Sequence, residues 1–125
     1  MINYQMRRDI MKFQVYQIQF TESQYRAINS NETVPAFEAR NRMTMDFGGD
    51  NIGNIASDAF EAGYYTHVSN IEAADLEQVF EIGNIGPESD IERLGRMSSI
   101  SVGDILIDES GTKSVVASFG FKEVN

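Results

Sequence analysis

Carboxylates near the C-terminus are the side chains best suited to chemistry in this sequence. Asp104 and Asp108 are four residues apart, and Glu109 follows directly. Residues of equal parity share a face of a strand, so Asp104 and Asp108 could form a pair for metal binding or acid–base work. Charges at a strand end beside a turn are more often simply solvated. We therefore predict no metal site, no cofactor and no catalytic residue at this position.

His67 is the only histidine, and the chain has no cysteine. One imidazole cannot form a zinc site alone, and thiolate ligands are absent. A Ser-His-Asp triad can be assembled on paper, but no serine stands in a nucleophile-elbow motif. The run YYTHVS around His67 indicates a strand, so we expect a structural or surface role for this side chain.

Two adjacent glycines, Gly48 and Gly49, precede a predicted helix. Free N–H groups at such a position can hold a phosphate. Asp46 and Asp50 flank the pair and would repel an anion, and the spacing matches neither a Walker nor a dinucleotide motif. A turn is the better interpretation.

Negative charge is concentrated in the middle of the chain. The net charge is -9, and no lysine or arginine lies between Arg42 and Arg93. The acidic residues of that stretch are Asp46, Asp50, Asp58, Glu61, Glu72, Asp75, Glu77, Glu81, Glu88, Asp90 and Glu92. Such a surface would repel phosphate backbones, which argues against nucleic-acid binding.

The acidic stretch has two interpretations. It can be a solvated face that keeps the protein in solution, or a surface that docks on a basic protein partner. Glu77 and Glu81 are four apart on a predicted helix, and like charges at that spacing cost roughly 0.2 to 0.5 kcal/mol. Because helix stability does not favour them, we predict the interaction surface at Glu72, Asp75, Glu77 and Glu81.

The C-terminal third contains a β-hairpin signal. Residues 103–108 and 113–124 are rich in β-branched and aromatic residues, and the segment between them is polar. Gly111 supplies the positive φ that a short turn requires, and it should resist replacement. Gly120, between Phe119 and Phe121, is likewise predicted as a structural turn residue, at a bulge or bend within the second strand.

The remaining elements follow from periodicity and end signals. Residues 12–20 alternate as a strand, and the opposite parity of Phe13 and Val15 indicates either a bulge near Val15 or an edge that is covered on both faces. Thr21 and Gln24 form a capping-box pair that begins a short helix, and Pro35 fits the first turn of another. A third helix covers residues 52–60 and ends at Gly63, and after a strand at residues 64–69 a fourth surrounds Leu76. Together these elements predict an α+β domain with a mainly antiparallel sheet of about four strands, three to four short helices on one face, and a C-terminal β-hairpin; a small barrel is the alternative.

The segment SISVGDILID, a turn glycine and the segment VVASFGFKEV together resemble the end of the YodL-like domain of phages and conjugative elements. Residues 65–68 resemble its middle strand, and Leu76, Glu77, Val79, Phe80 and Asn84 are similar to its short helix and the asparagine that follows. The resemblance covers residues 64–124, about half of the chain, and involves packing and turn residues. It implies a small α+β accessory domain of a mobile element and transfers no catalytic residue.

Residues 1–10 carry no clear period and are interpreted as an N-terminal appendage, with Met11 as an alternative start; residues 11–125 form a single domain. No apolar stretch approaches the roughly 18 residues that a membrane span requires, and no signal-peptide core is present. We expect a location in reducing cytoplasm, that of the host if the chain is phage-encoded. Self-association through an edge strand or the appendage stays open.

Two functions follow from these patterns. The first is a non-enzymatic module of phage-like origin that binds a protein partner through its acidic middle. The alternative is a small-molecule-binding or nucleic-acid-processing domain with a pocket between helices and sheet.

Overall fold

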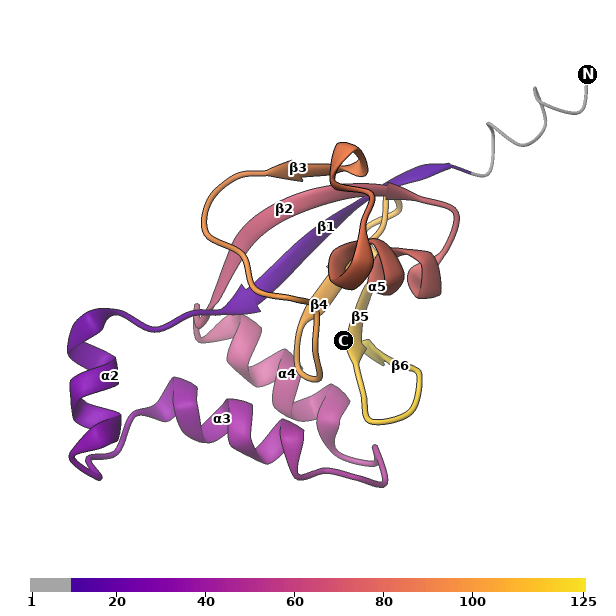
Figure 1. Ribbon diagram of the computed structural model, residues 1–125. Coiled ribbons are helices and arrows are strands. Elements are labelled where there is room, and N and C mark those ends of the chain that lie inside the picture. The colour runs from indigo at the N-terminus through magenta and orange to yellow at the C-terminus, as the bar shows by residue number, and fades with distance from the viewer. Residues whose placement is uncertain (1–9) are drawn as a thin grey trace, which may run out of the picture.

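A computed structural model describes residues 10–125, so the expectation for the N-terminal appendage falls almost wholly outside the described residues. One antiparallel sheet of six strands, in the order β3-β2-β1-β4-β5-β6, forms the centre of the molecule (Figure 1). The strands are β1 (Met11–Ile18), β2 (Tyr65–Ala73), β3 (Ile91–Arg93), β4 (Ile105–Ile107), β5 (Lys113–Val116) and β6 (Phe121–Val124). The helices are α2 (Glu22–Asn29), α3 (Pro35–Thr44), α4 (Ile52–Glu61), α5 (Leu76–Ile85) and the short 3-10 turn η1 (Glu88–Asp90).

The α+β class and the antiparallel sheet are confirmed, whereas the predicted number of about four strands is too low. Two features account for the difference. The segment predicted as one strand over residues 113–124 reverses direction, because Gly120 has a φ of +69° and the Ala117 N–H donates to the Gly120 carbonyl. Gly120 therefore closes a turn between β5 and β6 and divides the single strand that was expected over residues 113–124. The three-residue strand β3 adds the sixth strand beside β2.

β1 lies inside the sheet and is covered on both faces, which accounts for its apolar residues of both parities. Phe13 and Val15 face one side of the sheet, and Tyr16 and Ile18 face the other, as ordinary strand alternation requires. The register with β2 does shift beside Val15, but Val15 and Tyr16 pair with Ser69 and His67, so the extra residue is Val68 of β2 rather than a residue of β1.

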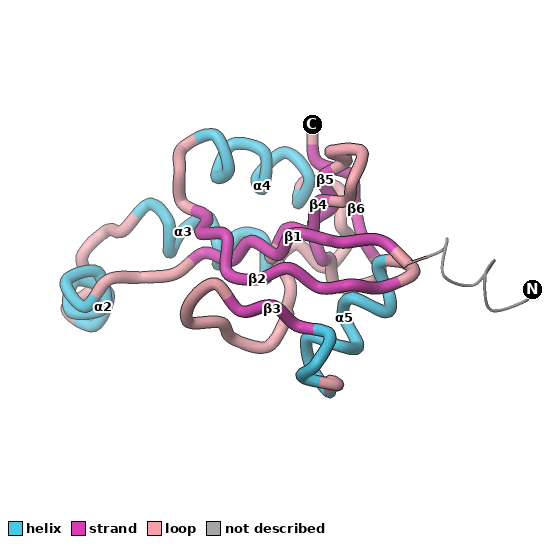
Figure 2. Tube along the Cα trace, turned by 90° about the horizontal axis from the view of Figure 1, so that it is seen from above, coloured by secondary structure: helices cyan, strands magenta, loops and turns pink. Residues whose placement is uncertain are grey.

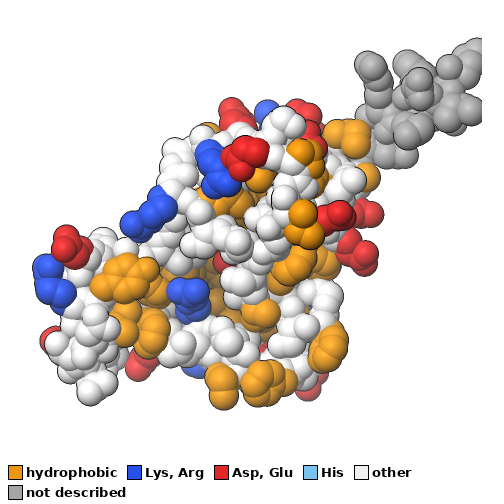
Figure 3. Space-filling model, in the orientation of Figure 1, with side chains coloured by type: hydrophobic (Ala, Val, Ile, Leu, Met, Phe, Trp, Pro, Cys, Tyr) orange, Lys and Arg blue, Asp and Glu red, His pale blue; other side chains and the backbone are white. Residues whose placement is uncertain are grey.

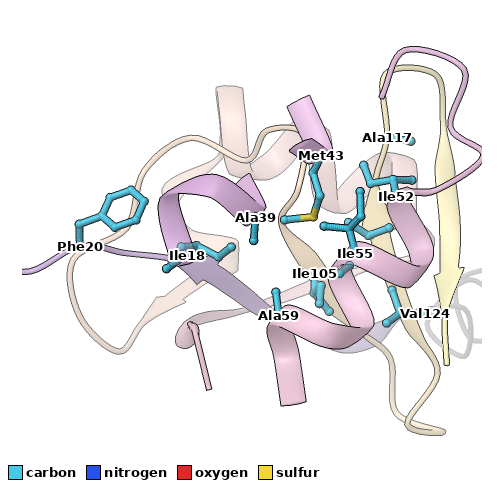
Figure 4. Close-up of a cluster of buried hydrophobic side chains, with 13 residues drawn as sticks. Ile18, Phe20, Ala39, Met43, Ile52, Ile55, Ala59, Ile105, Ala117 and Val124 are labelled. Carbon is cyan, nitrogen blue, oxygen red and sulfur yellow. The ribbon is translucent and has the colours of Figure 1, made fainter. Parts of the chain in front are cut away.

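The helices lie on both faces of the sheet, which corrects the expectation that they cover one face. Figure 2 shows α4 and α5 on opposite sides of the strands. On the first face, Ala39 and Met43 of α3 and Ile52, Ile55 and Ala59 of α4 pack toward Ile105 and Val124 of the sheet (Figure 4). On the second face, Val79 and Ile82 of α5 pack on Phe13, Val15, Ile71, Leu106 and Val116. Two separate cores thus share one sheet.

Helix ends follow their sequence signals closely. Thr21 and Gln24 form both hydrogen bonds of the capping box at α2, and Pro35 occupies the first turn of α3. Gly63, two residues after α4, has a φ of +82° and its N–H bonds the Phe60 carbonyl. In the part of the chain that the structure describes, no helix has both the length and the apolar character to cross a membrane.

Candidate protein-interaction surface

The α5 helix carries two carboxylates of the predicted surface, Glu77 and Glu81. Both are exposed. Within residues 10–125 the ion pairs are Arg26–Glu22 and Arg93–Glu88, so neither Glu77 nor Glu81 has a cationic partner. Figure 3 shows acidic side chains beside hydrophobic ones on the side of the molecule where α5 lies. These two charges are available to a partner.

Asp75 has a local structural role at the start of the same helix. It is the N-cap of α5, and its carboxylate accepts a hydrogen bond from the Gln78 N–H at 2.8 Å. The Gln78 side chain in turn accepts from the Ala74 N–H at 2.6 Å. A carboxylate at this position stabilises the helix by accepting from the free N–H groups of the first turn and by interacting with the helix dipole. The position of Asp75 is therefore explained without a partner.

Glu72 lies on the other face of the sheet from α5. Its strand neighbours Ile71 and Ala73 are buried in the core beneath α5, so the alternation of β2 turns Glu72 away. It pairs across the sheet with Lys12. The acidic stretch also places Asp58 and Glu61 on α4, on the far side of the sheet. The chain crosses the sheet through β2, so the central carboxylates form no single surface.

An apolar groove runs beside α5, with a volume of about 570 Å³. It is lined by Glu77, Phe80, Ile100, Ser101, Val102, Val116, Ala117, Ser118, Gly120 and Phe121. These residues come from α5, from the segment before β4, and from the β5–β6 hairpin. Within residues 10–125, Glu77 is the one ionisable side chain in this lining.

An exposed aromatic side chain, Phe80, belongs to the groove lining and is 38% exposed. Phe119, at the tip of the β5–β6 turn, is 86% exposed and lies between the lining residues Ser118 and Gly120 without belonging to the lining itself. Exposed apolar side chains at a groove are typical of a surface that a partner covers. Glu123 adds charge on this side, because strand pairing places it on the same face as Ser114 and Leu106.

The segment that walls the groove is fixed from two directions. On the α5 side, Ile100 is 2% exposed and packs so closely on Gly83 that a methyl group there would lie 2.6 Å from its Cγ1 atom. On the β1 side, the Gln17 side chain donates to the Ser98 carbonyl at 2.9 Å and accepts from the Ser98 N–H at 3.0 Å. The groove wall is therefore held in place by α5 and by β1.

Asp104 completes this attachment. Its Oδ2 atom accepts hydrogen bonds from the Gln17 side chain and from the Ser101 N–H, each at 3.0 Å. Burial raises the pKa of Asp104 to about 7, against the opposing effects of these two hydrogen bonds and of the Arg40 charge. Nearby, the Tyr65 hydroxyl donates to the Gly103 carbonyl at 2.6 Å, and burial, with a smaller contribution from the Asp104 charge, raises the pKa of Tyr65 above its ordinary value.

Asp104 and Asp108 are not brought together. Asp104 is buried, whereas the Asp108 Oδ1 atom accepts from the N–H groups of Ser110 and Thr112 in the β4–β5 turn. The hydrogen bond from the Ser110 hydroxyl, with further bonds from the turn backbone, lowers the pKa of Asp108. Gly111 occupies this turn with a φ of +89°. Over residues 10–125 no three carboxylate or imidazole groups lie close enough together to hold a metal ion.

The other residues considered for chemistry have structural surroundings. The His67 ring stacks on Tyr16 with centroids 4.8 Å apart, and its Nε2 atom lies 2.8 Å from the Asn70 side-chain oxygen. Gly48 and Gly49 lie in the turn between α3 and α4, where the Asp46 carboxylate accepts from the Asn51 N–H. An aspartate thus already occupies the position at which a phosphate would approach α4.

The alternative function included a pocket between helices and sheet, but sequence reasoning did not identify the residues that line the groove, and it missed the burial of Asp104. The groove combines segments far apart in the chain, so no local pattern marks it. Asp104 follows Gly103 at the start of a strand, a place where an aspartate is ordinarily solvated. One signal for the burial of Asp104 was available in the sequence. Asp104 has the same parity as the apolar residues Ile100, Val102 and Leu106, so it falls at a position where the strand pattern places buried side chains.

Comparison of the sequence with family models and with curated proteins, and of the fold with solved structures, finds no match.

Proposed function

We propose that this protein is a non-enzymatic interaction module that binds a basic segment of another protein through the acidic face of α5. The observation that carries the proposal is the exposure of Glu77 and Glu81, neither of which forms an ion pair within residues 10–125. Like-charged side chains at this spacing weaken a helix slightly, and Glu81 lies toward the end where the dipole disfavours negative charge. A basic partner relieves both costs on binding.

The resemblance of residues 64–124 to YodL-like domains supports an accessory role in a phage or other mobile element. The side chains behind this resemblance are packing and turn residues, among them Val79, Gly111 and Phe121. An accessory role of this kind is exercised on proteins of the host or of the element itself. The partner is then met in the host cytoplasm.

Selection from a random peptide library displayed on phage tests the proposal with a defined probe. The purified protein is expected to enrich peptides with Lys and Arg by about fivefold or more over their library frequency. The double variant Glu77→Gln/Glu81→Gln should lose this enrichment, because the amides keep the shape and remove the charge. The matched control is Glu72→Gln, which removes a carboxylate from the opposite face of the sheet.

Equal enrichment of basic peptides by the double variant and by the unaltered protein would contradict the proposal. Enrichment of peptides without basic residues would contradict it as well. Salt dependence is a further check, since binding through exposed charges weakens steeply between about 50 and 300 mM NaCl.

Small-molecule binding is a second candidate, favoured by the groove volume of about 570 Å³. Sites for small molecules usually combine an apolar wall with several converging polar groups. In the described part of the chain, Glu77 alone supplies an ionisable group to the groove. The groove therefore suits an apolar side chain better than a polar metabolite.

A further inference from the structure

We infer that the groove between α5 and the β5–β6 hairpin receives a large apolar side chain of the same basic segment that the carboxylates of α5 bind. This inference rests on the proposed function and specifies the partner as a linear segment in which an aromatic or large aliphatic residue has Lys or Arg close by. Its basis is the position of Glu77, which belongs both to the acidic face and to the groove lining.

The groove is apolar along its length. Ile100, Val102, Val116 and Ala117 form its wall, and Phe80 and Phe121 lie along its sides. Pockets of about 300 to 1,000 Å³ hold a drug-sized ligand, so the 570 Å³ here accommodates at least one aromatic side chain with its adjoining backbone. Removing such a side chain and the exposed Phe80 face from water drives the association.

The carboxylates near the groove determine which residues can flank the apolar side chain in the partner segment. Glu77 lies in the lining, Glu81 is one turn further along α5, and Glu123 shares the sheet face of the hairpin. Among the described residues, no lysine or arginine belongs to the lining. An apolar anchor flanked by acidic residues would be repelled, whereas one flanked by Lys or Arg would be attracted.

The outer strand beside the groove does not offer a site for adding a further strand. β6 is the edge of the sheet, and α4 packs against it. The Ser57 hydroxyl donates to the Asn125 carbonyl at 2.9 Å, and a Cβ atom at Gly53 would lie 3.0 Å from the Glu123 carbonyl oxygen. With those carbonyls facing α4, recognition must come from side chains in the groove rather than from main-chain pairing.

The test uses the most enriched basic peptide from the selection, labelled for fluorescence anisotropy. Phe80→Ala should weaken its binding by about tenfold, because the groove loses an aromatic wall. Ile85→Ala is the matched control: Ile85 is also an apolar residue of α5, it is 84% exposed, and it is absent from the groove lining. That control should leave the affinity within about twofold.

Filling the groove gives a second, independent variant. Ser118 lies in the lining, is partly exposed, and makes no side-chain hydrogen bond within residues 10–125. Ser118→Phe places a ring where the anchor would lie and should also weaken binding by about tenfold. The melting temperature of each variant is measured alongside, so that loss of binding is separated from loss of folding.

The outcomes separate the inference from the function on which it rests. If the selected peptides need Lys or Arg but carry no apolar residue whose change to Ser weakens binding, the groove inference is overturned and the proposed function stands. Unchanged affinity in folded Phe80→Ala and Ser118→Phe has the same meaning. If charge removal at Glu77 and Glu81 has no effect while Phe80→Ala does, the proposed function fails and the groove binds by apolar contact alone.

Discussion

Asp104 makes the stability of this protein dependent on pH near neutrality. The carboxyl group has a pKa of about 7 in the folded chain and 3.8 as its ordinary value. Because the folded pKa is raised, the protonated form stabilises the fold, and this contribution is lost as pH rises from about 4 through 7. Arg40 of α3 opposes the shift, Arg96 lines the same small cavity as Asp104, and Tyr65 of β2 is neutral at these pH values.

Asp104→Asn isolates this contribution. The amide keeps an oxygen that can accept from Gln17 and Ser101 but carries no charge. Between pH 5 and 6.5 the unfolding free energy of the unaltered protein should fall relative to that of the variant, by up to about 1.4 kcal/mol per pH unit. Urea unfolding of both proteins across this range measures the difference. If the difference in unfolding free energy between the two proteins does not change with pH, the pKa of Asp104 is the same in the folded and unfolded chain and the argument is wrong.

Gly111 should resist replacement, since its φ of +89° is a conformation that side chains disfavour. No atom would touch a Cβ there, so backbone strain alone acts. Gly111→Ala is expected to cost about 1 kcal/mol in thermal or urea unfolding. Gly95 is also surrounded by open space and has no positive φ, so Gly95→Ala should be neutral or slightly stabilising. Equal effects at both glycines would contradict the strain argument.

Residues that act locally were predictable, and residues that act across the fold were not. The capping box of Thr21 and Gln24 spans three residues, and Gly63 closes its helix within one turn. The partner of Asp104 is Gln17, 87 residues earlier. Whether an aspartate is buried depends on such a distant donor, which no local pattern specifies. The same limit explains why Asp104 and Asp108, equivalent by spacing, have opposite environments.

At the scale of elements, the contact between α5 and the segment before β4 depends on the absence of a side chain at Gly83. Alanine normally favours a helix over glycine by about 1 kcal/mol. Here its methyl group would overlap the Ile100 side chain, so Gly83→Ala should instead destabilise the protein by about 1 to 3 kcal/mol.

The double variant Gly83→Ala/Ile100→Val checks this cause. Valine lacks the terminal methyl group that makes the closest contact, so part of the loss should be recovered and the two changes should not be additive. Additive unfolding free energies would place the cost of Gly83→Ala elsewhere in α5.

The elements themselves were largely predictable, but their layering was not. Each helix has its own apolar stripe and end signals, and these depend on neighbouring residues. The side of the sheet on which a helix packs depends on the path of its connections. α5 follows β2 through a two-residue connection and turns to one face, while α3 and α4 fill the long excursion between β1 and β2 on the other. The reversal at Gly120 was similarly hidden, because a bulge and a tight turn use the same residue.

At the scale of the whole molecule, the carboxylates that cluster in the middle of the sequence do not cluster on one surface of the fold. The stretch without Lys or Arg, residues 43–92, begins at the end of α3, passes through α4 and crosses the sheet, and ends beyond α5. Its carboxylates are therefore divided between the two outer layers. The net charge of -9 keeps its general effect of repelling polyanions. The acidic surface proposed for recognition is smaller than the acidic stretch of the sequence. It consists of Glu77 and Glu81 of α5, beside the apolar groove.

Ser101 belongs to the lining of two separate cavities. It lines the groove beside α5, and it also borders a smaller cavity that contains Asp104, Arg40 and Arg96. Its N–H is held by the buried carboxylate. A segment that binds in the groove and shifts Ser101 would change the proton affinity of the Asp104 carboxyl. By thermodynamic reciprocity, protonation of Asp104 would change the affinity of the groove for that segment by the same factor. Binding in the groove would then depend on pH.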